Sequence, residues 1–257
     1  MIALVLATPT DREFSFLGPV TRMGAVMNGT THQEKRQIFI QNPLLGKLSE
    51  DEIEKLVTYS RVERYPAGER IFEKDSVGSC MMLVLRGSVR TSSISIDGRE
   101  IVFRMMQPGE VVGEIAALDG GNRSGDAFAM TDCELLVLQR RDFIPLLEKR
   151  PDICLMLINI LCDRLRKTSE QVEDLLFRHA EARIAKALLQ LSERFGRPGA
   201  NGRARELHLS QAELGNIIGI TRESVNKQLK HWERDGYVHV AKESILVLNR
   251  QKLEELI

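Results

Sequence analysis

The chain has 257 residues, enough for two domains that each bury a core. It balances 36 basic residues against 36 acidic ones, so its net charge excludes neither acidic nor basic partners. The C-terminal part from residue 178 is mildly basic, with 14 basic and 10 acidic residues, which suits a nucleic-acid-binding domain.

No targeting or metal-binding segment is evident. The four cysteines lie far apart: Cys80, Cys133, Cys154 and Cys162. Without C-x-x-C spacing they predict neither a zinc site nor an iron–sulfur cluster, and we expect a reduced, cytoplasmic protein with no metal. The apolar residues 1–7 follow no basic region, so they do not indicate a signal peptide, and no 18-residue apolar run predicts a membrane span. We expect residues 1–37 to be a disordered extension.

Residues 42–59 have the pattern of a helix. Ser49 and Glu52 have the spacing of a capping box, and apolar residues at 53, 56 and 57 form a stripe behind it.

Between residues 61 and 139 the pattern changes to short apolar runs separated by glycine and proline. The clearest runs are 82–85, 89–96, 101–105 and 135–138. Asp97-Gly98 between two of them predicts a β-hairpin. About eight short strands without a long helix among them predict a compact antiparallel roll or barrel.

One segment inside this β region, residues 113–124, is chemically different. Its first four residues, Gly113, Glu114, Ile115 and Ala116, can open a short helix whose free N–H groups suit an anion. The Arg123 guanidinium can then donate two parallel hydrogen bonds and the Ser124 hydroxyl one, and both groups suit phosphate oxygens. Glu114 fits beside phosphate only if it accepts from sugar hydroxyls. The alternative is a glycine-rich turn with solvated Arg and Glu side chains.

Residues 151–177 predict one long helix that begins with Pro151. Small and apolar residues recur at heptad spacing: Ile158, Leu161, Leu165, Thr168, Val172 and Leu175. This seam predicts a parallel helix pair that joins two subunits. The alternative is an amphipathic helix that packs on its own domain.

The C-terminal part predicts a helix-turn-helix. After a helix over 181–194 and a loop over 196–205, Ser210 and Glu213 form a second capping box. Gly219 suits the turn, and Thr221 is a good N-cap for the second helix. Strand-like runs at 237–240 and 245–248 predict a β-hairpin wing.

The second of these helices has an apolar face and a charged face. We expect the first helix to contact DNA through Ser210 and Gln211. The second helix contributes a larger set: Thr221, Arg222, Glu223, Asn226, Lys227 and Lys230. The alternative is a solvated face with Glu223–Lys227 as an i,i+4 pair, but such a pair contributes only a few tenths of a kcal/mol and does not explain the pattern.

Together these motifs resemble the Crp/Fnr regulators. Gly113-Glu114, Arg123-Ser124 and the following Ala127 are similar to the phosphate-binding cassette of cyclic-nucleotide-binding domains. The order of roll, long helix and helix-turn-helix is similar over about residues 42–248. The cAMP-receptor branch carries a Thr-Ser pair on the long helix, and Thr168-Ser169 stands there in this sequence.

The resemblance implies several further expectations. Thr168 would contact the adenine in its own subunit and Ser169 the adenine in the partner subunit. The effector would be cAMP, although Gly125-Asp126 is a less usual continuation of the cassette and keeps cGMP open. A branch with an N-terminal cysteine group fits badly because no cysteine precedes Cys80. A haem branch fits badly because all five histidines lie outside the roll, so no haem is expected.

We therefore expect an α+β chain in four parts: residues 1–37, a cyclic-nucleotide-binding β-roll over 38–150, a dimerisation helix over 151–178, and a winged helix-turn-helix over 179–257. The expected function is a homodimeric transcription regulator, with palindromic double-stranded DNA and RNA polymerase as partners, no membrane and no enzymatic activity. Two alternatives stay open: a regulator with a different effector or none, and a nucleotide-binding regulatory subunit of an enzyme or channel.

Overall fold

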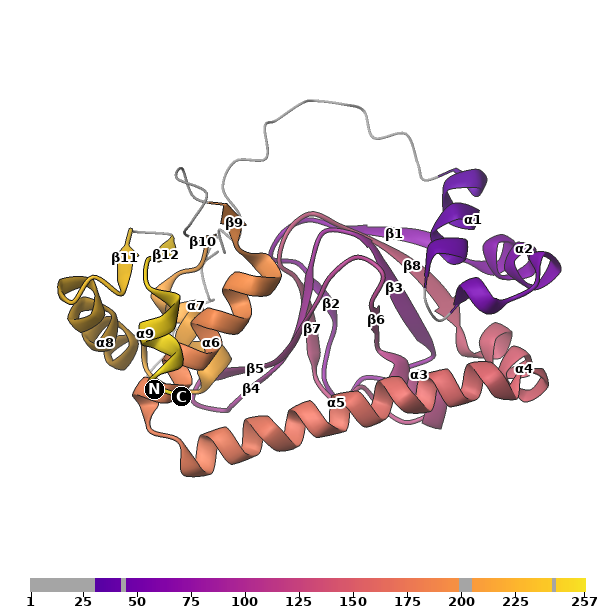
Figure 1. Cartoon of the computed structure of the whole chain (residues 1–257). Helices are drawn as coiled ribbons and strands as arrows, with labels where there is room; N and C mark the ends of the chain where they lie inside the picture. Colours follow the sequence, from indigo (N-terminus) through magenta and orange to yellow (C-terminus); the bar gives the residue numbers. More distant parts are fainter. Residues whose placement is uncertain (1–30, 43–44, 199–204, 242–243) are drawn as a thin grey trace, which may run out of the picture.

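The computed structural model describes residues 31–42, 45–198, 205–241 and 244–257. Figure 1 shows a β-rich N-terminal part and a smaller C-terminal part, connected by one long helix that runs along the β-rich part. The expected α+β order of roll, long helix and helix-turn-helix is confirmed. Among the described residues, no helix is long and apolar enough to cross a membrane.

The N-terminal helices differ from the sequence-based prediction. Helix α1 (His32–Gln41) lies partly inside the expected disordered extension, and a 3₁₀ turn η1 (Leu45–Lys47) separates it from α2 (Glu50–Tyr59). The expected single helix from residue 42 is wrong because Asn42 ends α1: its side chain accepts from the Leu45 N–H at 3.1 Å. The Ser49 capping box is confirmed. Residues 1–30 of the expected extension lie outside the described part of the chain.

Eight strands form the roll: β1 (Arg61–Tyr65), β2 (Arg70–Phe72), β3 (Cys80–Arg86), β4 (Val89–Ile94), β5 (Glu100–Met106), β6 (Val111–Val112), β7 (Asp126–Ala129) and β8 (Cys133–Gln139). They make two four-stranded antiparallel sheets, ordered β1-β8-β3-β6 and β2-β7-β4-β5. The hairpin predicted from Asp97-Gly98 is confirmed as the β4–β5 turn. The short helix predicted after Gly113 is α3 (Glu114–Asp119).

Both faces of the first sheet, β1-β8-β3-β6, are covered by other parts of the domain. Alternate residues of β3 and β8, such as Val84 and Leu135, face the second sheet and form the core inside the roll. The other face, including Leu83 and Leu136, packs against α1, α2, α4 (Arg140–Lys149) and the start of α5 (Pro151–Phe177). The first half of α5 is thereby anchored to the roll.

The C-terminal domain is a winged helix-turn-helix, as expected. Its helices are α6 (Ala180–Phe195), α7 (Gln211–Ile218), α8 (Arg222–Arg234) and α9 (Arg250–Glu254). Its strands β9 (Arg197–Pro198), β10 (Arg205–Leu207), β11 (Val238–Val240) and β12 (Ile245–Val247) form one sheet, ordered β11-β12-β10-β9. The β11–β12 hairpin is the predicted wing.

The C-terminal domain docks on the β4–β5 side of the roll. Val102 and Met105 belong to the same buried core as the helices of the C-terminal domain. Asn216 on α7 donates to the Glu100 carboxylate at 3.2 Å. This docking brings α6 beside β5 and α5, so that both domains contribute to one cavity.

Candidate functional site: a cavity between the roll, α5 and α6

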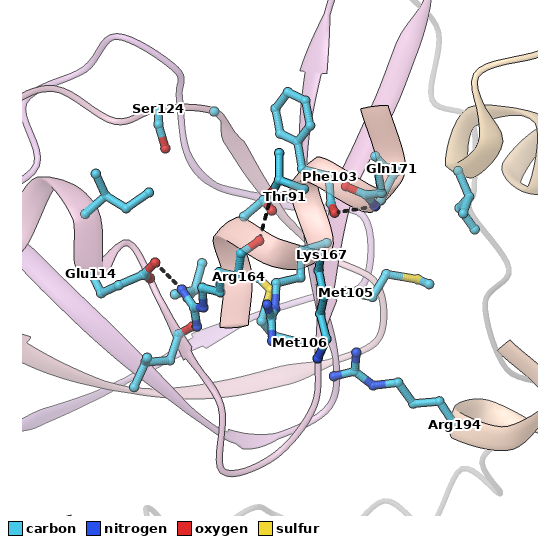
Figure 2. A pocket seen from close by; sticks show the side chains of 18 of the residues that line it. Thr91, Phe103, Met105, Met106, Glu114, Ser124, Arg164, Lys167, Gln171 and Arg194 are labelled. Atoms are coloured by element: carbon cyan, nitrogen blue, oxygen red, sulfur yellow. Dashed lines mark hydrogen bonds and ion pairs between the residues drawn. The ribbon is translucent and has the colours of Figure 1, made fainter. Parts of the chain in front are cut away.

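The described part of the chain contains a cavity of ≈ 580 Å³ where the roll meets α5 and α6. Figure 2 shows Glu114 and Ser124 at one end and Arg194 at the other. Seven of the eight residues expected to contact a nucleotide line it: Gly113, Glu114, Ile115, Ala116, Arg123, Ser124 and Thr168. The structure thus brings the cassette and the long helix to one cavity.

Arg123 is the most distinctive group at the cassette end. It is buried, with 4% of its surface exposed, and its guanidinium donates to the Gly113 carbonyl at 2.7 Å and to Cys80 Sγ at 3.3 Å. Its guanidinium carbon also lies 4.3 Å from the centre of the Phe72 ring. Within the described residues no carboxylate forms an ion pair with it. Burying a cation among neutral groups alone costs desolvation free energy, and a bound anion would compensate for it.

Gly113 makes this arrangement possible. Its backbone is left-handed, with φ 76° and ψ 14°, where it precedes α3. A side chain added there would collide with the Arg123 guanidinium. The left-handed turn therefore favours glycine, and a larger residue would also displace the Arg123 guanidinium.

Glu114 is buried and forms an ion pair with Arg164 of α5, drawn as a dashed line in Figure 2. Arg164 also donates to the Val111 carbonyl at 2.8 Å. The cassette helix is thus tied to the long helix by a charge pair that the sequence analysis missed. A signal was available, because Arg164 lies four residues before Thr168 and so shares its face of the helix.

The Thr-Ser pair divides between two environments. Thr168 lines the cavity, and its hydroxyl donates to the Arg164 carbonyl at 3.0 Å. Ser169 is exposed and is not among the described residues that line this cavity. The cavity also includes Thr91 of β4 and Gln171 of α5, which the sequence analysis did not identify; Gln171 donates to the Phe103 carbonyl at 3.2 Å.

The less usual Gly125-Asp126 has a structural reason. A side chain on Gly125 would lie 3.0 Å from the Ser92 carbonyl oxygen, so the second sheet leaves little space there. Asp126 is buried and accepts from the Lys74 N–H at 3.1 Å. Asp126 therefore holds a neighbouring turn and is not among the described residues that line the cavity.

The outward side of α5 carries a row of exposed apolar residues. Ile158, Leu165 and Val172 are 52%, 68% and 49% exposed. Leu175 of the predicted seam is 41% exposed, but its side chain lies beside Gly219 of the helix-turn-helix. Leu161 is half-buried and Thr168 faces the cavity edge. Leu155 and Leu176, 62% and 70% exposed, extend the row beyond the predicted seam. Exposed apolar area of this extent on one helix is typical of an interface.

The helix-turn-helix residues are held by local caps. Ser210 caps α7 in a capping box with Glu213, and Thr221 caps α8 by accepting from the Ser224 N–H at 3.2 Å. Gly219 adopts φ 67° at the turn between them. Val225, Leu229 and Trp232 are buried and fix one face of α8.

The α8 side chains predicted to contact DNA lie away from this buried face, and Ser210 and Gln211 lie at the start of α7. Exposed residues are Thr221, Arg222, Glu223, Lys227 and Lys230, while Ser210, Gln211 and Asn226 are half-buried. Glu223 and Lys227 are both exposed, and the described residues contain no ion pair between them. The described residues also contain no cluster of three or more His, Cys, Asp or Glu side chains that could hold a metal.

Comparisons with known proteins agree with this architecture. Residues 62–150 match the cyclic nucleotide-binding domain family, and residues 182–256 match the Crp-like helix-turn-helix domain family. The cyclic AMP receptor protein of Thermus thermophilus is 31% identical over 84% of this chain and 96% of its own length. A CRP-like cAMP-activated global transcriptional regulator of Mycobacterium tuberculosis is 31% identical over 74% of this chain and 84% of its own length.

Among solved structures, the c-di-GMP responsive global regulator CLP of Xanthomonas campestris is similar with a TM-score of 0.69 and 25% identity, over 77% of this chain and 99% of that one. A CRP/FNR-family transcriptional regulator of Thermus thermophilus has a TM-score of 0.67 and 27% identity, over 76% of this chain and 97% of that one. This chain belongs to the Crp/Fnr family of DNA-binding transcription regulators.

Proposed function

We propose that the protein is a homodimeric transcription regulator whose DNA binding responds to cAMP. The observation that carries the effector assignment is buried Arg123, a cation with no carboxylate partner in the described structure, next to the turn that opens α3. The phosphate of a cyclic nucleotide supplies the missing negative charge. Ser124 offers a hydroxyl to the same phosphate, and Glu114 can accept from the sugar hydroxyls.

The choice of cAMP rests on the relatives and on Thr168. Relatives that match 74–84% of this chain at 31% identity are named for cAMP. Thr168 lines the cavity, where its hydroxyl can meet a purine of the same subunit. Ser169 lies on the exposed side of α5, where it can reach the nucleotide of a partner subunit. Effector cGMP is the runner-up.

Dimerisation through α5 would cover the apolar row that includes Ile158, Leu165 and Val172. Two parallel α5 helices place two copies of α8 in a two-fold arrangement. Half-sites in the DNA are then palindromic and separated by about 34 Å, one helical turn. RNA polymerase is the expected protein partner at a promoter. A nucleotide-binding subunit of an enzyme or channel is the less favoured class, because this chain carries its own helix-turn-helix.

Titration calorimetry on nucleotide-free protein tests the effector. We expect cAMP to bind at least about tenfold more tightly than cGMP, a difference of about 1.4 kcal/mol. Tighter binding of cGMP than of cAMP would show that cGMP is the effector. Binding of neither nucleotide would overturn a cyclic-nucleotide effector altogether.

A further inference from the structure

Phe103 of β5 is a large apolar side chain that stays 43% exposed where it lines the cavity. Two other phenylalanines line the same cavity, and an arginine lies over the ring of each. Arg123 lies 4.3 Å from the centre of the Phe72 ring, and Arg194 lies 5.4 Å from the centre of the Phe195 ring. Among the described residues, no cation covers the Phe103 ring in this way, so its face is left for a ligand.

The strand pairing explains how Phe103 comes to this position. Thr91 of β4 pairs with Arg104, and the next residue, Ser92, pairs with Val102. This register leaves Phe103 as one extra residue between two paired positions, which is a β-bulge. A bulge interrupts the regular alternation of side chains along a strand, and bulges are common beside ligand sites, where they re-aim a side chain.

The ring of Phe103 packs against the cassette. A Cβ atom added to Gly125 would lie 3.4 Å from the Phe103 Cε2 atom, so the ring lies over the Gly125 backbone. Gly125 directly follows Ser124, whose hydroxyl is proposed to bind the phosphate. In the view of Figure 2, the Phe103 ring is drawn between Ser124 and Gln171. The ring is therefore close to any nucleotide that the cassette holds by its phosphate.

The backbone of Phe103 is tied to the long helix. Gln171 donates from its side-chain amide to the Phe103 carbonyl at 3.2 Å. Gln171 lies three residues after Thr168, so the two side chains share one face of α5, and both line the cavity. Phe103 thus lies between the cassette and the turn of α5 that carries Thr168.

We propose that the Phe103 ring binds the purine base of the effector by stacking on it. The inference rests on the proposed function, which places the phosphate at Arg123 and the base beside Thr168. Every base has a π face that can stack on an aromatic side chain. Phe103 covers one face of the base while Thr168 meets its polar edge. This role accounts for an exposed aromatic ring, for the bulge that carries it and for the glycine beneath it.

Titration calorimetry of cAMP on the full-length protein tests the role of the ring. Phe103→Ala should lower the cAMP affinity by about tenfold or more, as loss of one base–aromatic stack does. Phe103→Tyr keeps the aromatic face and should bind cAMP within about threefold of the wild type. Phe103→Leu fills much of the same space without an aromatic face, so its affinity should stay at least about fivefold below that of the wild type.

Ile96→Ala is the matched control. Ile96 lies fully exposed at the tip of the same β4–β5 hairpin and is not among the described residues that line the cavity. Its replacement removes an apolar side chain of similar exposure from the same element. The Ile96→Ala protein should bind cAMP within about threefold of the wild type.

Fluorescence gives a second measurement that does not depend on the Phe103→Ala protein. Phe103→Trp places an indole at the proposed stacking position, and cAMP should quench its emission because a stacked base contacts the ring directly. The chain has a single tryptophan of its own, Trp232, which is buried in the C-terminal domain, and the wild type supplies its background signal. The emission of the control Ile96→Trp should change with cAMP no more than that of the wild type.

Three results would overturn the stacking role of Phe103. The first is a Phe103→Ala protein that binds cAMP within about threefold of the wild type. The second is a Phe103→Leu protein that binds cAMP as tightly as Phe103→Tyr, because the ring would then only fill space. The third is a Phe103→Trp protein whose emission is unchanged at saturating cAMP. If Arg123→Gln still abolishes cAMP binding in these cases, only the stacking role fails. A wild type that binds no cyclic nucleotide would remove the proposed function as well.

Discussion

Arg164 on α5 and Glu114 on α3 form an ion pair with side chains only 16% and 5% exposed, and this pair connects the cassette to the long helix. The first half of α5 packs on the roll, and its outward side carries the proposed subunit interface. A ligand that moves α3 therefore acts on α5 through a charged contact as well as through packing. Such a ligand changes the dimer only by binding one arrangement more tightly than the other.

The Glu114–Arg164 ion pair predicts that replacing one partner lowers the free energy of unfolding more than replacing both. Arg164→Met leaves the buried Glu114 carboxylate without its cation, and we expect the free energy of unfolding to fall by about 3–5 kcal/mol. The double variant Glu114→Gln/Arg164→Met should regain most of this loss. Urea unfolding of the wild type, Glu114→Gln, Arg164→Met and the double variant measures the difference, and a double variant no more stable than Arg164→Met would contradict the ion pair.

The exposed row on α5 predicts the oligomeric state. Leu165→Lys should give monomers in sedimentation experiments, because a two-fold helix pair would bring two lysines together in an apolar interface. Asn159→Lys, at an exposed polar position of the same helix, is the control and should stay dimeric. A Leu165→Lys protein that sediments as a dimer would show that α5 is not the interface.

The capping box of α7 predicts a pH effect on stability. Burial raises the pKa of Glu213, and the Ser210 contacts that lower it do not cancel that shift. The protonated form is thus favoured in the folded protein, so Glu213 costs stability once the pH rises above its unfolded value of 4.5.

Glu213→Gln removes this charge, and glutamine can keep the capping box. We expect its free energy of unfolding to exceed that of the wild type at pH 7, with the difference vanishing below pH 4.5. Thermal unfolding across this range measures the effect. A variant less stable than the wild type at pH 7 would mean that the carboxylate is compensated in the folded protein.

The exposed face of α8 predicts two different effects on DNA binding. Arg222 opens the helix, where it can read a guanine, and Glu223 can accept from cytosine N4. Glu223→Ala should therefore reduce the binding free-energy difference between C·G and the other base pairs at one position by about 1–3 kcal/mol. Lys230 should contact only the DNA phosphate backbone, so Lys230→Ala should weaken binding to all DNA sequences equally. The slope of log affinity against log salt concentration should fall by about one.

Competition binding with single-base variants at two salt concentrations separates these effects. Unchanged base preference in Glu223→Ala would show that α8 is not oriented in the groove as proposed. Lys227 can reach a second guanine or a phosphate, and a lysine reads guanine less strictly than an arginine does.

Local signals in the sequence were reliable guides to the fold. The Ser49–Glu52 and Ser210–Glu213 capping boxes and the Asp97-Gly98 turn all depend on neighbouring residues, and the structure contains each of them. The same kind of signal existed for α1, because Thr31 and Glu34 also form a capping box. It was overlooked because the helix behind it, with its many charged residues, has no clear apolar stripe.

Features that depend on distant residues could not be predicted from the sequence. Arg164 reaches Glu114 only because α5 lies along the roll, and they are fifty residues apart. The α6 end of the cavity depends on how the C-terminal domain docks on β5, a contact made by Val102, Met105 and Asn216. No local pattern in the chain encodes that docking.

The most direct test of the central claim measures DNA affinity with and without cAMP. DNA selected from a random pool in the presence of cAMP supplies the probe, and fluorescence anisotropy measures its binding to the wild type and to Arg123→Gln. We expect cAMP to increase the DNA affinity of the wild type by about tenfold or more, which corresponds to a coupling free energy of about 1.4 kcal/mol. The Arg123→Gln protein should remain a dimer, and cAMP should not change its DNA affinity. Equal stimulation of both proteins, or none in the wild type, would contradict a cAMP response through Arg123.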